Sequence, residues 1–377
     1  MVWRELELAP GLAPDWLGPR PVFIPLASDE EACVVGSPEA MTLGFDIDRA
    51  IASLERETWS SEMRSLTHML PFSYERLPWF IRGLGAATLF SPRRLTRHRK
   101  RPTWPIAPAL DVLRFLRGDR LPELWSSGAW GACVTCDVDS LAGWRRALRV
   151  AESVEAQGFR ATFFVVGEVL ASEPAIATEL CARGHEIGSH DIRHDNALAR
   201  LRGEALRSRL ARARDTIRPF EGVGFRSPSL MRSPEFLQAV GDFFDYDSSV
   251  CDTDLEYARG VMTVRPYLLD GACELPITLP MDSSLRFTLH STRSIDAIWR
   301  QKCEWIRALG GLATLTIHSE PQLAGGRPFL KMVSAFLAWL RTQHELEHLL
   351  ARELAERMRG ASKGEVLSSL SAPACDA

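Results

Sequence analysis

From Gly131 onward, short apolar runs alternate with amphipathic segments along the chain. The runs are bounded like strands, and we expect strands at 131–136, 160–166, 185–188, 222–225, 243–246, 273–277 and 312–317. Helical spacing of apolar residues predicts helices between them, for example at 140–157 and 293–309. Repeated strand-then-helix units are typical of an α/β domain with a largely parallel sheet. The pattern alone leaves open whether that sheet closes into a barrel.

The first part of the chain shows no such alternation. One helix is predicted there, at 48–70, and a run of arginine and lysine between prolines at 92–105 is typical of a solvated linker. The end of the chain is rich in Ser, Ala and Gly, which predicts disorder. We therefore expect an accessory region with a basic linker at 1–105, a main domain at 106–358 and a disordered tail at 359–377.

Composition and charge exclude several classes of protein. The chain has 377 residues, of which 25% are charged, and its net charge of -3 gives no global attraction to nucleic acid or anionic lipid. No apolar run approaches the roughly 20 residues that span a bilayer, and the first residues lack the pattern of a signal peptide. We therefore expect a cytoplasmic protein with reduced cysteines that binds no nucleic acid, whereas its oligomeric state is unknown.

Two histidines four residues apart, His190 and His194, follow the apolar run at 185–188. They open a segment that we expect to be helical, so both imidazoles can point to one place. The best source of a third ligand is Asp139, which follows the run at 131–136. Two histidines and one carboxylate leave open coordination positions for water, which is the arrangement of a catalytic metal.

Other polar residues also fall at or just past the carboxyl end of a predicted strand. They are Asp137, Arg226, Asp247 and His318. In a βα barrel this edge is where active sites are assembled, and it brings together residues that are distant in sequence. The sequence therefore predicts that these side chains and the metal ligands share one edge.

Five segments that contain these residues resemble, in order, the polysaccharide deacetylase family, also called the NodB-homology or carbohydrate esterase family 4 domain. The segments lie at 135–139, 161–165, 189–194, 224–228 and 315–318. The resemblance covers a little over half of the chain. It implies a distorted (β/α)7 barrel of the TIM-like kind, with an additional N-terminal region, that hydrolyses N-acyl groups from sugars with a divalent metal.

The resemblance also implies which residues bind the metal. Asp139, His190 and His194 would be the ligands, usually of zinc, although cobalt and iron are also used in the family. The first motif here is Asp-x-Asp in place of two adjacent aspartates. Which of Asp137 and Asp139 is the general base and which is the ligand therefore remains open.

Roles for the other residues follow from the same resemblance. Asp137 would be the general base, His318 the general acid, and Arg226 would hold the base in place. Asp247 would support the site, and Glu320 could contact the substrate amine. This division of labour suits amide hydrolysis, which needs one group to take a proton from water and another to protonate the departing amine.

We therefore expect a metal-dependent hydrolase of linear amide C–N bonds that removes an acetyl or formyl group from an amino sugar. Its substrate would be an N-acylated sugar or a sugar-linked carrier in the synthesis of a surface polysaccharide or glycoconjugate. The alternative is a catalytically inactive relative that binds sugar or a partner protein in polysaccharide assembly. The sequence names neither the sugar nor the acyl group.

Three further patterns have plainer explanations. His344 and His348 fit the His-Glu-x-x-His signature of zinc proteases, but no third ligand follows, and we expect the last strand of the barrel there. The residues from Gly44 to Asp48 contain a second Asp-x-Asp, which we expect to be a strand end and a helix cap. Two histidines and a carboxylate also form the site of non-haem iron oxygenases, but the strand-then-helix succession argues against their β-sandwich scaffold.

Overall fold

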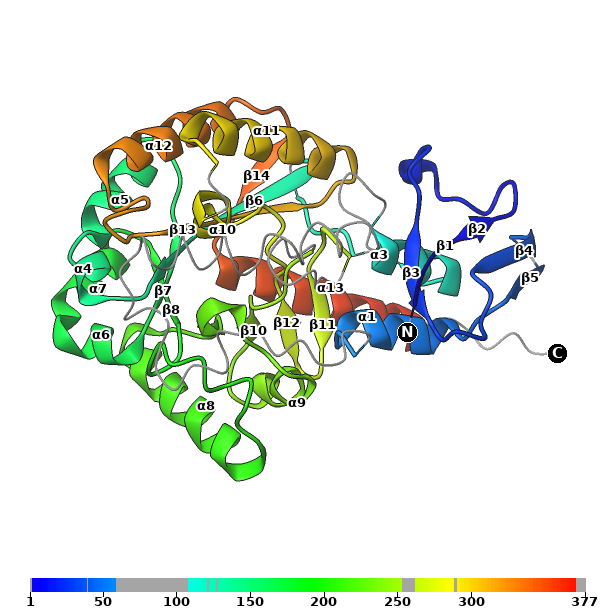
Figure 1. Ribbon diagram of the computed structural model, residues 1–377, viewed down its shortest axis with the longest axis horizontal. Coiled ribbons are helices and arrows are strands. Elements are labelled where there is room, and N and C mark those ends of the chain that lie inside the picture. The colour runs from blue at the N-terminus through cyan, green and yellow to red at the C-terminus, as the bar shows by residue number, and fades with distance from the viewer. Residues whose placement is uncertain are drawn as a thin grey trace.

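A curled sheet of nine strands lies at the centre of the computed structural model (Figure 1). The structure describes residues 2–38, 40–58, 108–120, 122–126, 128–252, 262–287 and 290–370. The strands of the sheet are β6 (Trp130–Val138), β7 (Thr162–Val165), β8 (Glu186–Ser189), β9 (Gly224–Phe225), β10 (Tyr246–Asp247), β11 (Tyr267–Leu269), β12 (Ala272–Glu274), β13 (Leu312–His318) and β14 (Leu346–His348).

The sheet is largely parallel, and its order is β11-β12-β10-β9-β8-β7-β6-β13, with β14 paired to the start of β6. Only the β11–β12 pairing in it is antiparallel. Beyond β12 the chain returns to β13, where the Leu279 N–H donates to the Thr314 carbonyl at 3.2 Å. These contacts curl the sheet toward closure, and the distorted (β/α)7 barrel predicted from the sequence is confirmed.

Alternation along β6 separates the barrel interior from the layer beneath the helices. Cys133 packs with Phe164 and Tyr246, whereas Cys136 belongs to the larger apolar core. The two cysteines therefore point to opposite faces of the strand, and neither shares a site with the other. The side chain of Asp137 emerges on the same face as Cys133, at the carboxyl end of the strand.

Most of the helices lie around the sheet in Figure 1, whereas the last helix of the chain crosses the middle of the view. These helices are α4 (Leu141–Trp144), α5 (Ala147–Glu155), α6 (Gly167–Ser172), α7 (Pro174–Ala182), α8 (Gly203–Ile217), α9 (Pro234–Ala239), α10 (Asp282–Phe287), α11 (Thr292–Ala308), α12 (Arg327–Arg341) and α13 (Ala351–Leu370). The predicted helix at 140–157 is broken into α4 and α5. The break accompanies burial of Trp144, whose indole N–H donates to the Glu173 carbonyl at 3.0 Å.

The segment after β8 is not the helix that the sequence predicted. Asp191 and Asn196 both have positive φ angles, 62° and 56°, and the next helix, α8, begins only at Gly203. The carbonyls of Asp191 and Ile192 accept hydrogen bonds from the first amides of α6 instead of from a following helical turn. Tertiary contacts therefore override the helical pattern in this loop.

Residues 2–38 and 40–58, the part of the N-terminal region that the structure describes, form two small sheets and one α-helix beside the barrel (Figure 1). Its elements are β1 (Val2–Glu5), β2 (Glu7–Leu8), β3 (Phe23–Leu26), β4 (Cys33–Ser37), β5 (Ala40–Leu43) and α1 (Ile47–Glu55). Asp46 caps α1, since its side chain accepts from the Arg49 N–H, so this Asp-x-Asp is the expected helix cap. The helix α3 (Ala109–Arg117) packs beside α1 and leads toward the barrel.

Two predictions about the ends of segments need correction. The helix predicted at 48–70 ends at Glu55, and Glu57 then adopts a φ angle of 50°. Residues 59–70 and the basic linker lie outside the described residues. At the other end, α13 continues to Leu370 through much of the segment expected to be disordered, because a helix anchored by buried Leu354 and Met358 adds further residues at low cost.

No helix among the described residues combines the length and the apolar character that crossing a membrane requires.

Candidate metal and catalytic site

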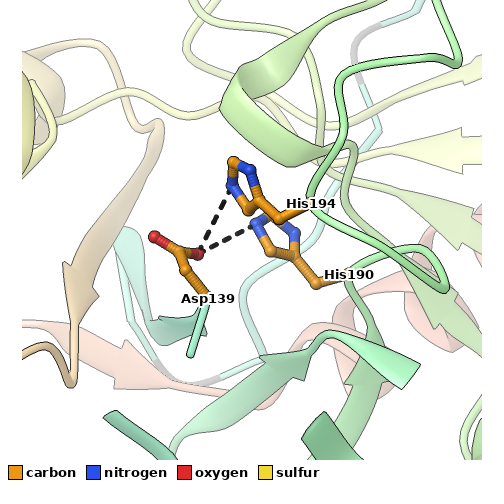
Figure 2. A group of neighbouring side chains, drawn as sticks. All are labelled: Asp139, His190 and His194. Atoms are coloured by element: carbon orange, nitrogen blue, oxygen red, sulfur yellow. Dashed lines mark ion pairs between the residues drawn. The ribbon is translucent and has the colours of Figure 1, made fainter. Parts of the chain in front are cut away.

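Three predicted ligands lie together beyond the carboxyl end of the sheet (Figure 2). Asp139 follows β6, and His190 and His194 come from the loop after β8. Asp139 Oδ1 is 3.4 Å from His190 Nε2 and 3.6 Å from His194 Nε2. Tetrahedral zinc with bonds of about 2.0–2.1 Å places two ligands about 3.3 Å apart. The spacing therefore fits a small divalent cation.

The hydrogen bonds around His190 support the same assignment. Its Nδ1 lies 2.8 Å from the carbonyl oxygen of Arg226, which can only accept, so Nδ1 carries the proton. The other ring nitrogen, Nε2, faces Asp139 Oδ1, which is buried and has no hydrogen-bond partner among the described residues. A histidine that donates one ring N–H to a backbone carbonyl and turns its other nitrogen toward a carboxylate has the usual arrangement of a metal ligand.

The protonation states of the ligands also suit a metal. Burial lowers the pKa of His194 to about 4, against the opposing effect of Asp139. Burial alone would raise the pKa of Asp139, but His194 and His190 hold it below its ordinary value. At neutral pH the site therefore presents an unprotonated imidazole and a carboxylate, which are the forms that bind metal.

Asp137 lies two residues before the ligand Asp139 and is held by a buried arginine. Arg226 NH1 donates to Asp137 Oδ1 at 2.8 Å and to Thr135 Oγ1 at 2.8 Å. The guanidinium also donates to Ser248 through Nε and NH2. Arg226 is fully buried, so its orientation is fixed on both sides and Asp137 is fixed with it.

His318 faces Asp137 from the end of the neighbouring strand β13. Its Nε2 is 3.9 Å from Asp137 Oδ2, and its Nδ1 is 2.6 Å from Asp282 Oδ1. Burial alone would lower the pKa of His318, but the charges of Asp282, Asp139 and Asp137 raise it to about 10. His318 is therefore protonated at neutral pH.

Asp282 is the residue of this site that the sequence analysis missed. Its other carboxylate oxygen accepts the backbone N–H of His318 at 2.9 Å, so it orients the whole histidine. It lies at the start of α10, after a proline-bounded stretch with neither strand nor helix periodicity. The one signal in the sequence that could have pointed to Asp282 is an aspartate directly after this irregular segment.

Glu320 lies at the site, and its carboxylate already has partners. It accepts the backbone N–H groups of Asp139 at 3.2 Å and Ser140 at 3.1 Å, and the Ser140 hydroxyl at 2.7 Å. Burial raises its pKa, and so does the charge of Asp139. These contacts hold the turn that carries Asp139; the predicted contact with a substrate amine stays a prediction.

The contacts of Asp247 are with residues other than the three proposed metal ligands. Its Oδ1 accepts the hydroxyl of Ser249 at 2.6 Å, and Ser249 Oγ accepts the N–H of Ser227, directly after Arg226. It also lies against Glu274, and burial raises the pKa of Asp247 to about 6. Asp247 therefore supports the loop after β9 through an intermediate serine.

The remaining histidines near the barrel have structural partners. His348 lies in β14, the expected last strand, where its Nε2 accepts the Arg160 N–H at 2.9 Å. His185 Nδ1 accepts the Ala161 N–H at 3.0 Å. His344 is exposed and lies before the strand. The structure therefore does not bring His344 and His348 together as a protease site.

Comparisons with known proteins bear on the family and the fold. Residues 140–240 match the family model for polysaccharide deacetylase. No match was found among curated proteins. Similar solved structures include a candidate polysaccharide deacetylase from Mycobacterium smegmatis, with 20% identity over 64% of this chain and 95% of that chain and a TM-score of 0.55.

Two further structures have the same fold. A candidate polysaccharide deacetylase from Pseudomonas aeruginosa PAO1 shares 15% identity over 64% of this chain and 95% of that chain, with a TM-score of 0.52. The allantoinase Puue shares 16% identity over 64% of this chain and 94% of that chain, also with a TM-score of 0.52. The family match confirms the resemblance predicted from the sequence, and the structures confirm the fold.

Proposed function

We propose that this protein removes an N-acyl group, acetyl or formyl, from an amino sugar by hydrolysis, with a divalent metal held by Asp139, His190 and His194. The observation that carries the proposal is the buried Asp139 Oδ1, which faces two imidazole nitrogens and has no hydrogen-bond partner among the described residues. The match to the polysaccharide deacetylase family supports the substrate class. Zinc is the metal that two histidines and one carboxylate suit best.

Asp137 is the proposed general base. A bound metal would supply a Lewis acid that polarises the acyl carbonyl and lowers the pKa of water. Arg226 holds Asp137 Oδ1, so Oδ2 is left facing His318 across the site. Asp137 can take the proton of the attacking water through that oxygen. Asp139 is the less suitable base, because both of its imidazole neighbours approach the same oxygen.

His318 is the proposed general acid. The amine of an amide leaves only when its nitrogen is protonated, and His318, with a pKa raised to about 10, carries a proton to give at neutral pH. Its Nδ1 is occupied by Asp282, so only Nε2 can deliver that proton. The 3.9 Å between His318 Nε2 and Asp137 Oδ2 brings the acid and the base to the same part of the site.

We further propose that the substrate is a sugar, free or linked to a carrier, used in surface polysaccharide or glycoconjugate synthesis in the cytoplasm. The net charge of -3 gives no global attraction to nucleic acid, so nothing in the composition competes with a sugar substrate. Because an allantoinase shares the fold, allantoin belongs among the compounds tested.

The test combines metal analysis with turnover. Metal content is measured in the wild type, His190→Ala and Asp139→Ala, and amine release from N-acetyl and N-formyl amino sugars is followed in the same samples. We expect about one equivalent of metal in the wild type, lost in both variants together with amine release. His344→Ala, which changes an exposed histidine, is the matched control and should keep metal and activity.

Two results would contradict the proposal. A folded wild type that takes up neither zinc, cobalt nor iron would show that the three residues form no metal centre. A wild type that holds metal but releases amine from no amino sugar would favour the alternative of a sugar-binding or partner-binding module, and cleavage of allantoin alone would replace the substrate class.

A further inference from the structure

The loop that carries two of the proposed ligands needs a support of its own. His190 and His194 are four residues apart, a spacing that a helix would align, but the loop between them is irregular and Asp191 has a φ angle of 62°. A positive φ costs free energy for a residue other than glycine. Contacts from outside the loop must therefore hold the two imidazoles at their separation.

One side chain makes most of these contacts. Arg209, from α8, donates to Asp191 through Nε at 2.7 Å and NH2 at 3.0 Å. The same NH2 group donates to both carboxylate oxygens of Asp195 at 3.1 Å, and it lies 3.3 Å from the carbonyl oxygen of Arg193. Arg209 thus contacts two residues that lie between the ligands, Asp191 and Arg193, and one that directly follows His194, Asp195.

Burial makes this contact strong and specific. The side chain of Asp191 is 1% exposed and that of Arg209 is 14% exposed, whereas Asp195 is 37% exposed. A buried carboxylate is costly without a partner, so Arg209 cannot leave Asp191 without a large penalty. The planar fork of the guanidinium reaches two carboxylates at once, which the single ammonium of lysine cannot reproduce.

The start of the loop is fixed by the helix α6 as well. The N–H groups of Gly167 and Glu168 donate to the carbonyls of Asp191 and Ile192. A Cβ at Gly167 would meet Ile192 Cα at 3.3 Å, so these amides sit close against the loop. The backbone after His190 is thereby anchored to α6, and the position of His194 depends on Arg209.

We propose that Arg209 is a positioning residue that sets the separation of His190 and His194 for the metal, through its joint contact with Asp191 and Asp195. The inference rests on the proposed metal-dependent function of the same site. Outer partners of metal ligands typically change metal affinity by about 10–100-fold. Loss of Arg209 should therefore weaken metal binding within that range, before any effect on substrate is considered.

The experiment compares Arg209→Met and Arg209→Lys with Arg207→Met. Arg207 lies on the same helix and forms an exposed ion pair with Asp242, so it is the matched control. Zinc affinity is measured by competition with a chromogenic chelator, the visible absorption spectrum is recorded with cobalt, and circular dichroism follows the thermal unfolding of the metal-free proteins. We expect Arg209→Met to lose about 10–100-fold in zinc affinity and to change the cobalt spectrum, with Arg209→Lys intermediate and Arg207→Met unchanged.

Asp195→Asn is the second variant, because its partly exposed side chain can change without leaving a buried charge. It decides the matter if Arg209→Met does not fold, and it should weaken zinc binding while Asp191 stays paired. If the folded Arg209→Met keeps the zinc affinity and the cobalt spectrum of the wild type, the inference is wrong while the proposed function stands. If Arg209→Met does not fold, the same result for Asp195→Asn has the same meaning. A wild type that binds neither metal would overturn the proposed function and the inference with it.

Discussion

At the scale of single residues, the contact between His318 Nδ1 and Asp282 Oδ1 decides the pH range in which His318 can donate a proton. The pKa of His318 is raised to about 10, from an ordinary value of 6.5, by Asp282 first among the neighbouring charges. As the pH rises through that value His318 loses its proton, so the rate of amide hydrolysis should fall on the alkaline side.

Replacing Asp282 with asparagine removes the largest of the charges that raise this pKa. The opposing effect of burial then weighs more against the remaining charges of Asp139 and Asp137, so the pKa falls and the alkaline limb of kcat/KM should move to lower pH by about 1–3 units. The measurement is the pH dependence of amine release by Asp282→Asn and the wild type. Asp270→Asn, which loses an exposed ion pair with Arg56, is the control. An alkaline limb that stays in place in Asp282→Asn would show that Asp282 does not set the pKa of His318.

The same residues show why the sequence predicted one part of the site and missed another. Asp139, His190 and His194 stand directly after apolar runs, so strand periodicity places them at one edge. Asp282 and Arg209 act through partners distant in sequence, and nothing in their own segments distinguishes them from solvated charges. Contacts of this kind become visible only once the chain is folded.

At the scale of secondary structure elements, strands were predicted better than the segments between them. The strands β6, β8 and β13 are buried along their whole length, and burial of both faces determines them regardless of their neighbours. The break between α4 and α5 accompanies the contact of Trp144 with Glu173. The irregular loop after β8 is held by Arg209 and by the first amides of α6. Local periodicity carries no information about such contacts.

The strand β14 gives a prediction at this scale. Its His348 accepts the Arg160 N–H through Nε2, and Nδ1 lies 3.2 Å from the Ala132 carbonyl, so the neutral ring joins β14 to β6. Burial lowers the pKa of His348 to about 4. The unfolded chain takes up a proton near pH 6.5 and the folded chain does not, so stability present above 6.5 is lost as the pH falls to about 4.

From this shift alone, the free energy of unfolding should fall by up to about 3 kcal/mol between pH 6.5 and 4. Urea unfolding at several pH values measures it. His348→Gln can still accept from Arg160 and cannot take up the proton, so its stability should depend less on pH than that of the wild type. His344→Gln, at the exposed start of the same motif, should keep the wild-type dependence. Equal slopes for His348→Gln and the wild type would contradict this account.

At the scale of the whole molecule, the N-terminal region is attached to the barrel through paired charges. Arg232, after β9, donates to Glu57 through Nε at 2.6 Å and NH2 at 2.7 Å, and both side chains are almost fully buried. Glu55, two residues earlier, forms a less buried pair with Arg114 of α3. The two glutamates therefore offer a comparison between a contact that reaches the barrel loop and one that does not.

The pair of Glu57 and Arg232 should matter to both stability and the site. Arg232 also donates to the carbonyl of Leu230, in the loop whose backbone starts at Arg226. Glu57→Gln leaves a buried guanidinium without its principal counter-charge, which typically costs about 3–5 kcal/mol. Glu55→Gln removes a pair whose side chains are 14% and 15% exposed, so it should cost less than Glu57→Gln. Urea unfolding of the full chain compares the two variants.

Measurements of activity distinguish two roles for Glu57, one in stability alone and one in shaping the site. At a temperature where both variants are folded, Glu57→Gln should release amine more slowly than Glu55→Gln, because the loop it loosens supplies the carbonyl that orients His190 and the guanidinium that holds Asp137. Equal rates of amine release by Glu57→Gln and Glu55→Gln would show that Glu57 contributes to stability and that the N-terminal region takes no part in the chemistry. Slower turnover at full metal content would instead show that this region helps to build the edge of the barrel where hydrolysis is proposed.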